Sequence, residues 1–247
     1  MKSLRRIHTA YGLMVFTILF VISFIPLLVP IIFPKKYKWV GIVNRLWAKL
    51  LCIFCFLPYR VECRTPLDQK QQYIFCSNHF SYFDIPTLGL NPVNTIFVGK
   101  NAMENIPLFG FMYRKLHITV DRARLKSKYD SIIKSRLALD EGKSLVFYPE
   151  GGIYTQHPPK MARFKDGAFR LAIEKQIPIV PVTIPNNWII LPSDEFLLRQ
   201  GTVKVIFHDP IDTKGLDLTS VDSLKERVFK VIDDELSIYE HRPHLVE

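Results

Sequence analysis

The sequence predicts an α/β fold with a mostly parallel central sheet flanked by helices, preceded by an N-terminal membrane-associated two-helix anchor. Two observations lead to this prediction. Between residues 71 and 247, short β-rich runs alternate with helical segments, and a stretch of 24 uncharged residues, 10–33, comes before them. Alternation of strands and helices in a chain of 247 residues, 48% of them hydrophobic, implies a parallel sheet covered on both faces.

The first element is the apolar segment 10–33. As a helix it would be about 36 Å long, enough to cross a hydrocarbon core of roughly 30 Å. It is longer than the apolar part of most signal peptides, and no small-residue cleavage site follows it. Basic residues lie on both sides, which fits a hairpin with both ends in the cytoplasm: Lys2, Arg5 and Arg6 before it, and Lys35, Lys36 and Lys38 after it.

The second element, residues 39–57, reads as an amphipathic helix at the membrane surface or as the return arm of that hairpin. Arg45 and Lys49 are four residues apart on one face, with Trp39 and Trp47 among the apolar positions. The alternative is an ordinary core helix whose two cations reach out to water. We therefore expect an anchor over residues 1–62 and a catalytic domain over 63–247.

The net charge of +10 is concentrated in the same region. Residues 1–70 have a net charge of +9, whereas residues 71–247 have a net charge of only +1. No zinc-finger, RNA-binding or helix-turn-helix signature accompanies the charge, so we expect no nucleic-acid partner. Basic residues beside an apolar anchor instead indicate anionic lipid headgroups.

The elements of the second region follow in order along the chain. Four helices are expected, at 107–115, 124–141, 165–175 and 220–237. Six strands are expected, at 73–77, 95–99, 118–120, 144–148, 177–184 and 202–208. Ligands bind at the carboxyl ends of parallel strands, and unusual polar residues follow four of these strands: His79 with Asp84, Lys100, Asp121 with Arg122, and Glu150 with Gly151 and Gly152.

His79 and Asp84 form a candidate base and orienting carboxylate. A neutral histidine can accept a proton from a hydroxyl, and a carboxylate behind it stabilises the imidazolium that forms. Five residues of ideal helix would place the two about 140° apart, so the segment between them must turn. An acceptor alcohol could then attack an acyl carbonyl directly; a covalent route through Cys76 or Ser81 is the alternative.

Three further elements lie near this rim. The Pro-Glu-Gly-Gly turn at 149–152 has free backbone N–H groups suited to an anion. Arg163 and Lys165 lie at the start of a helix, with Lys165 directed to the same rim, and the apolar run with Pro181 is expected to be a buried strand. The four cysteines include one Cys-x-x-Cys pair in an apolar setting, without histidine at ligand spacing, so we expect no metal.

Four segments in this order resemble the motifs of the glycerolipid acyltransferase family, in particular the bacterial 1-acyl-sn-glycerol-3-phosphate acyltransferases. They are NHFSYFD, FVGK with PLFGFMYRKLHITVDR, FYPEGG and IPIVPVTI. The resemblance implies a catalytic His79–Asp84 dyad and acyl transfer from acyl-CoA or acyl-carrier protein to the 2-hydroxyl of lysophosphatidic acid, giving phosphatidic acid. It assigns Lys100, Gly110 and Arg122 to the acceptor-binding motif, Glu150 and Gly151 to the third motif and Pro181 to the fourth. It also implies no cofactor and a place at the cytoplasmic face of the bacterial inner membrane.

The third motif departs from the family pattern. Family members usually read Glu-Gly-Thr-Arg there, whereas this chain has Gly152 and Ile153 in the last two places. Either another cation binds the phosphate of the acceptor, or the acceptor is another lyso-lipid, such as a lyso-aminolipid or a lysophospholipid. The candidate cations are Arg122, Lys160, Arg163 and Lys165. A catalytically silent membrane-binding module is a more distant alternative, against which the intact His79, Asp84 and Glu150 argue. A metal-dependent hydrolase is disfavoured because no ligand set has usable spacing.

Overall fold

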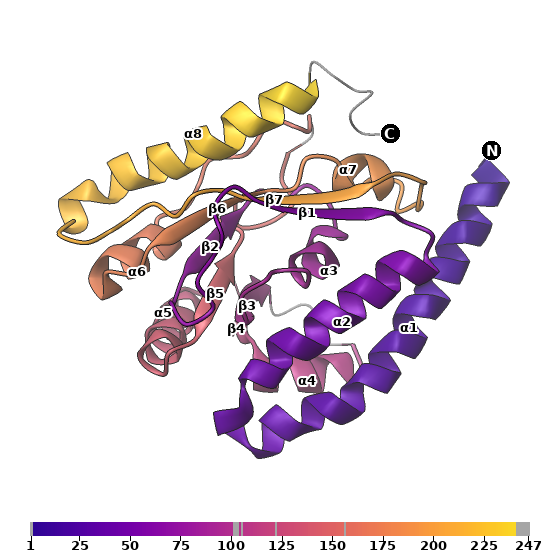
Figure 1. Cartoon of the computed structure of the whole chain (residues 1–247), viewed down its shortest axis with the longest axis horizontal. Helices are drawn as coiled ribbons and strands as arrows, with labels where there is room; N and C mark the ends of the chain where they lie inside the picture. Colours follow the sequence, from indigo (N-terminus) through magenta and orange to yellow (C-terminus); the bar gives the residue numbers. More distant parts are fainter. Residues whose placement is uncertain (1, 101–103, 105, 122, 156, 241–247) are drawn as a thin grey trace.

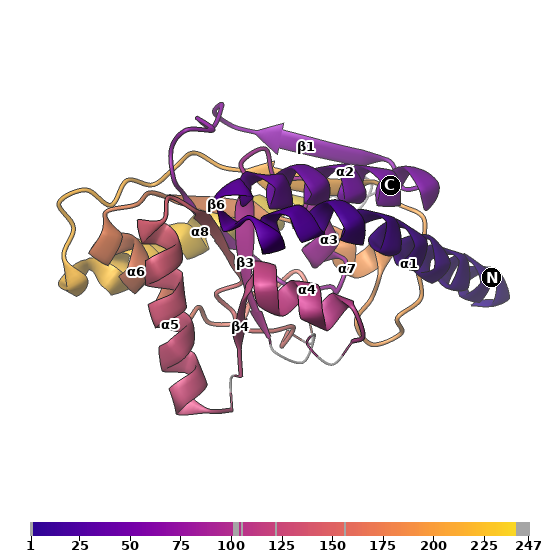
Figure 2. The ribbon, with the colours of Figure 1, turned by 90° about the horizontal axis from the view of Figure 1, so that it is seen from below.

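The computed structural model describes residues 2–100, 104, 106–121, 123–155 and 157–240. Within them, a sheet of seven strands has helices on both faces and an N-terminal pair of helices at one side (Figures 1 and 2). The helices are α1 (Lys2–Ile32), α2 (Lys38–Phe54), α3 (Asp84–Leu88), α4 (Phe109–Leu116), α5 (Leu125–Asp140), α6 (Gly167–Lys175), α7 (Asn187–Ile190) and α8 (Val221–Glu240). The strands are β1 (Tyr59–Cys63), β2 (Ile74–Ser77), β3 (Thr95–Lys100), β4 (Ile118–Val120), β5 (Ser144–Phe147), β6 (Ile179–Thr183) and β7 (Val203–Phe207).

The sheet has the order β1-β7-β6-β2-β5-β3-β4. The five strands from β6 to β4 are mutually parallel, whereas β7 runs antiparallel to β6 and β1 pairs in parallel with β7. The predicted α/β class with a mostly parallel sheet is therefore confirmed. The carboxyl ends of β2, β3, β4 and β5 lie along one rim, as expected.

The structure corrects one boundary of the predicted organisation. Residues 59–63 form β1, which pairs with β7 from Tyr59↔Val203 to Cys63↔Phe207. The division expected between residues 62 and 63 therefore falls inside a strand, and the sheet domain begins at Tyr59. The sequence did not predict β1 because the charged residues Arg60 and Glu62, exposed and half-buried on this edge strand, interrupt the apolar pattern.

The central strands are apolar along their whole length because both faces of the sheet are covered. On one face, Ile74, Leu145 and Ile179 pack against α5, α6 and α8. On the other face, Phe75 and Val146 pack with Leu88 of α3 and Ala48 of α2. All four residues of β2 are buried, so this strand is fixed from both sides and places the loop that follows it.

The N-terminal helices α1 and α2 form an antiparallel hairpin, reversed at Pro34–Lys36 (Figure 1). Phe16 of α1 meets Trp47 of α2 edge-on, with ring centroids 5.1 Å apart. The hairpin also packs on the sheet domain, because Phe20 and Leu27 share a cluster with Met112 of α4.

The outer side of the hairpin is apolar and exposed. The exposed residues include Ile18, Ile22 and Ile25 of α1, and Ile42 and Leu46 of α2. Among the described helices, α1 is the one long and apolar enough to cross a membrane. The N-terminal region therefore contains two helices, as predicted, but only one candidate membrane span among the residues described. Exposed apolar surface of this extent is typical of membrane or protein contact.

Candidate active site

The loop after β2 brings His79 and Asp84 together. His79 Nδ1 lies 3.0 Å from Asp84 Oδ2, and both side chains are buried or nearly so. The same Asp84 oxygen accepts hydrogen bonds from the backbone N–H groups of Phe80 and Ser81, each at 2.8 Å. The chain therefore folds back on the aspartate that begins α3, which is the turn that the spacing required.

This geometry fixes the protonation pattern of His79. An ionised carboxylate only accepts hydrogen bonds, so the ring proton belongs on Nδ1, and Nε2 keeps its lone pair. Asp84 is also held from behind, because Asn187 Nδ2 donates to its Oδ1 at 3.0 Å and to Thr87 Oγ1 at 2.8 Å. Nothing in the sequence indicated this role for Asn187, which lies 103 residues from Asp84.

The loop itself is tied to the segment after β6. The side-chain amide of Asn78 donates to the carbonyl of Ile184 at 2.9 Å and accepts from its N–H at 2.8 Å. Ser81 Oγ donates to the carbonyl of Leu191 at 2.7 Å. Both side chains are fully buried, so the backbone around His79 is held rigidly.

Glu150 links the third motif to the backbone of His79. Its Oε1 accepts the His79 N–H at 2.7 Å, and its Oε2 accepts the Ala162 N–H at 2.8 Å. Burial raises the pKa of this carboxyl from 4.5 to about 7, a shift that the two backbone hydrogen bonds partly oppose. The charge of Asp84 adds a smaller upward shift.

Tyr148, two residues earlier, supports the imidazole ring. The rings of Tyr148 and His79 are stacked, with centroids 4.0 Å apart and planes 22° apart. This stacking contact helps to fix the orientation of the imidazole ring. The Tyr148 hydroxyl is buried without a hydrogen-bond partner in the described part of the chain, and burial raises its pKa well above 10.

The glycines of the third motif make room for a lysine. Gly151 has a φ of +85°, and a Cβ placed on it would lie 2.3 Å from Lys165 Nζ. The Lys165 ammonium lies 5.4 Å from the ring centroid of Tyr154. The structure thus brings Glu150, Gly151 and Lys165 together, and Glu150 contacts the backbone of His79.

The other predicted site residues are more widely spread. Lys100 is exposed at the end of β3, two strand spacings or about 10 Å along the rim from β2. Arg163 is exposed and lies near the start of α8, where its charge contributes, after the hydrogen bond from Lys225, to lowering the pKa of Asp222. Arg122 lies outside the described residues.

Gly110 and Pro181 occupy packed positions. A Cβ on Gly110, in α4, would lie 1.9 Å from the backbone oxygen of Glu104. Pro181 is buried in β6 opposite Cys76 of β2. Both residues are therefore closely packed by their neighbours in the described part of the chain.

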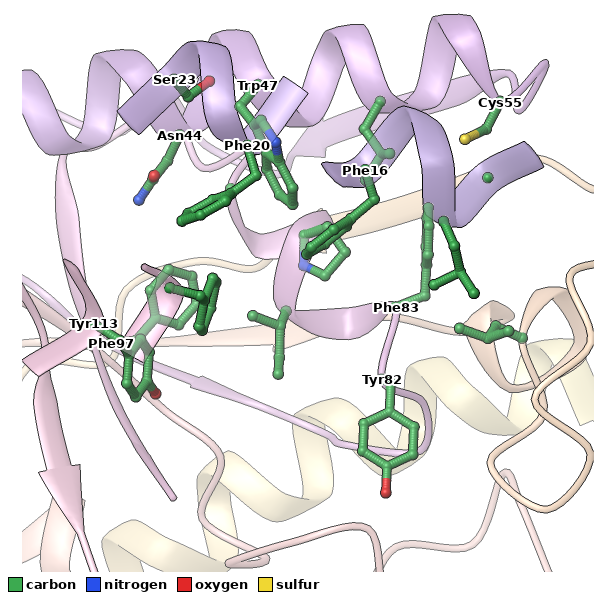
Figure 3. Close-up of a pocket in the computed structure, with 18 of the residues that line it drawn as sticks. Phe16, Phe20, Ser23, Asn44, Trp47, Cys55, Tyr82, Phe83, Phe97 and Tyr113 are labelled. Atoms are coloured by element: carbon green, nitrogen blue, oxygen red, sulfur yellow. The ribbon is translucent and has the colours of Figure 1, made fainter. Parts of the chain in front are cut away.

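A long apolar cavity of about 320 Å³ lies against the back of the His79–Asp84 loop (Figure 3). Phe16 and Phe20 of α1 and Trp47 of α2 line one wall, and Phe83 and Phe97 belong to the facing wall. Its lining also includes His117, whose pKa burial lowers to about 4. The hairpin therefore encloses an apolar chamber next to the proposed base.

Neither candidate for a covalent route is placed to act as a nucleophile. Cys76 is fully buried in β2, and burial raises the pKa of its thiol. The Ser81 hydroxyl proton is engaged by the Leu191 carbonyl. The described residues also contain no cluster of three metal-binding side chains. The arrangement can therefore present a histidine, oriented by a carboxylate, to a hydroxyl group near an apolar cavity.

Comparison with known proteins identifies the family of this chain. A model of the Acyltransferase family matches residues 59–185. The chain is 28% identical over 188 residues to a chloroplast 1-acyl-sn-glycerol-3-phosphate acyltransferase of Arabidopsis thaliana, covering 75% of this chain and 52% of that protein. It is 29% identical over 216 residues to the 1-acyl-sn-glycerol-3-phosphate acyltransferase of Haemophilus influenzae, covering 82% and 87%. The chain spans about half the length of its matched plant relatives.

The fold also matches a solved structure. The crystal structure of the 1-acyl-sn-glycerophosphate acyltransferase PlsC from Thermotoga maritima superposes with a TM-score of 0.76 at 21% identity. The match covers 96% of this chain and 98% of that chain, so it includes the N-terminal hairpin. The family resemblance predicted from the four motifs is confirmed.

Proposed function

Because this chain belongs to the Acyltransferase family, we propose that it transfers an acyl chain from an acyl thioester to the 2-hydroxyl of lysophosphatidic acid, forming phosphatidic acid. The observation that carries the proposal is the His79–Asp84 hydrogen bond at the sheet rim, with an apolar cavity behind it. Two matched relatives have this activity in their names, which supports the same acceptor.

The geometry supports a direct transfer. His79 Nε2 removes the proton from the acceptor hydroxyl as its oxygen attacks the thioester carbonyl, and Asp84 stabilises the imidazolium. The tetrahedral intermediate then collapses, and the C–S bond breaks. The leaving thiolate takes the proton from His79 and departs as the thiol of coenzyme A or of the carrier protein. His79 returns to its neutral form, so no acyl-enzyme and no cofactor are needed.

The cavity and the hairpin support a lipid substrate. A volume of about 320 Å³ is within the range of small-molecule sites, and aromatic side chains line it with few polar groups. We propose that the exposed face of α1 and α2 inserts into the cytoplasmic leaflet of a bacterial inner membrane. The acyl chain would then enter the cavity from the membrane side.

A second acceptor class is favoured by one observation. Gly152 and Ile153 replace the threonine and arginine usual in the third motif, so an acceptor without a phosphate is the alternative. Lyso-aminolipids and other lyso-lipids with a free hydroxyl would use the same base and the same cavity.

The test is an acceptor panel assayed with one acyl thioester in membranes that contain the protein. We expect phosphatidic acid from lysophosphatidic acid, and less product from a lyso-aminolipid or from lysophosphatidylcholine. His79→Ala should abolish turnover, while His157→Ala, which removes an exposed histidine, should keep it. Unaltered turnover by His79→Ala would refute the mechanism, and a preference for the lyso-aminolipid would refute the proposed acceptor.

A further inference from the structure

We infer that the Lys165 ammonium, seated on Gly151 and against the ring of Tyr154, binds the anionic headgroup of the acceptor in place of the missing arginine of the third motif. The inference rests on the proposed function, since it concerns the acceptor of that reaction. We call the site formed by Gly151, Tyr154 and Lys165 the lysine seat. Three groups of contacts, around residues 149–154 and 162–165, support it.

The first group fixes the segment that carries Lys165. The Ala162 N–H donates to Glu150 Oε2 at 2.8 Å, and the Lys165 N–H donates to the Pro149 carbonyl at 2.9 Å. Residues 162–165 therefore run directly against the turn 149–151. Because the other oxygen of Glu150 accepts the His79 N–H, one carboxylate connects the backbone of the proposed base to the segment that ends at Lys165.

The second group explains why the lysine folds over this turn. Any Cβ at position 151 would lie 2.3 Å from Nζ and 2.8 Å from Cε of Lys165. A Cβ at position 152 would lie 2.9 Å from the ring of Tyr154. The threonine usual at position 152 would occupy the space that the tyrosine ring uses here. The loss of that side chain and the presence of Tyr154 are thus coupled.

The third group concerns the charge that the seat offers. The Lys165 ammonium lies over the face of the Tyr154 ring in a cation–π contact, with 5.4 Å between Nζ and the ring centroid. No ion pair with an acidic side chain is found for Lys165 among the residues described. The adjacent Asp166 is already paired with Lys225 at 2.7 Å, and both oxygens of Glu150 accept backbone N–H groups. The three ammonium donors therefore stay available to a ligand.

The ligand class follows from this chemistry. A lysine ammonium is a compact point charge that accepts a phosphate monoester or a carboxylate without the planar fork of arginine. We favour Lys165 over Arg163, because the charge of Arg163 acts on Asp222 near the start of α8. The shared chemistry is an anionic group on the acceptor near the reacting hydroxyl, and the experiment separates its two sources.

The test compares purified full-length variants in mixed micelles, with KM and kcat measured separately. Lys165→Met should raise the KM for lysophosphatidic acid about 10- to 100-fold at unchanged kcat. Lys165→Arg should recover part of the loss, and Lys70→Met, an exposed lysine preceding β2 at the opposite rim, should change neither constant. Competitive inhibition by sn-glycerol 3-phosphate should weaken by the same factor in Lys165→Met. Lys165 is exposed, so its variants should unfold at the temperature of the wild type.

The outcomes separate the seat from the proposed function. If the wild type acylates lysophosphatidic acid and Lys165→Met keeps its KM, the seat is overturned and the function stands. If the wild type prefers a lyso-aminolipid with a free carboxylate and Lys165→Met raises the KM for it, the seat stands and the function is overturned. A larger rise in Lys160→Met or Arg163→Met also overturns the seat.

Discussion

Replacing Glu150 by glutamine should change how the stability of the protein depends on pH. The Glu150 side chain is buried, and each of its oxygens accepts one backbone N–H, from His79 and from Ala162. Burial raises its pKa from 4.5 to about 7. The folded protein therefore holds this proton more tightly than the unfolded chain does.

The size and sign of the effect follow from linkage. At 1.36 kcal/mol per pKa unit, the difference between 4.5 and about 7 corresponds to about 3 kcal/mol. Because the folded pKa is the higher one, this contribution is complete below pH 4.5 and is lost as the pH rises through 7. The wild type should thus lose about 3 kcal/mol of stability from this group over that range.

The glutamine side chain cannot ionise, so the variant does not lose this stability as the pH rises. Its amide nitrogen must face one of the two backbone N–H groups, which costs about 1–3 kcal/mol at every pH. Glu150→Gln should be the less stable protein at pH 4.5, and the gap should shift in its favour by about 3 kcal/mol by pH 8. For a chain of this size, that shift corresponds to about 6–12 °C in the difference between melting temperatures.

The assay is thermal unfolding of both proteins in the same detergent at several pH values from 4.5 to 8. Glu226→Gln, which removes an exposed carboxylate on α8, is the matched control and should follow the wild-type curve. Parallel curves for wild type and Glu150→Gln would show that Glu150 ionises alike in the folded and unfolded protein, and would refute the reasoning.

Two further predictions concern the proposed base and its neighbours. The Asp84→Asn variant has a single carbonyl oxygen, which cannot accept from both the three donors at Oδ2 and the Asn187 amide at Oδ1. Its kcat should therefore fall about 10³- to 10⁴-fold with little change in KM. A loss of kcat below tenfold in steady-state assays would contradict the orienting role. Cys76→Ala should keep the wild-type kcat. It should lose on the order of 1 kcal/mol of unfolding free energy, because the Cys76 thiol is buried in β2. An acyl group found on Cys76 by mass spectrometry would indicate a covalent route instead.

The sequence predicted the central strands well for a physical reason. Strands covered on both faces must be apolar throughout, as β2 and β6 are, so continuous apolar runs reveal them. The edge strand β1 carries the charged residues Arg60 and Glu62, and therefore lacks this signal. The short helices α3 and α7 were also not predicted, because five and four residues are too few to show a helical period.

The site was predictable only in part. The strand ends placed His79, Asp84 and Glu150 on one rim, because chain direction alone brings such residues together. The residues that hold them were not predictable in this way. Asn187 reaches Asp84 from a helix far along the chain, and the seat of Lys165 depends on the missing side chains of Gly151 and Gly152.

The contacts that hold the loop after β2 determine when the site can form during synthesis. Asn78 binds Ile184, Asp84 binds Asn187 and Ser81 binds Leu191, and the partners are 106, 103 and 110 positions apart in the sequence. Closing such long loops is entropically costly, so these bonds form after the intervening strands have paired. A nascent chain that ends before residue 184 therefore cannot organise His79, even though its hairpin is already complete. With the hairpin inserted in a membrane as proposed, attachment would precede the formation of the site during translation.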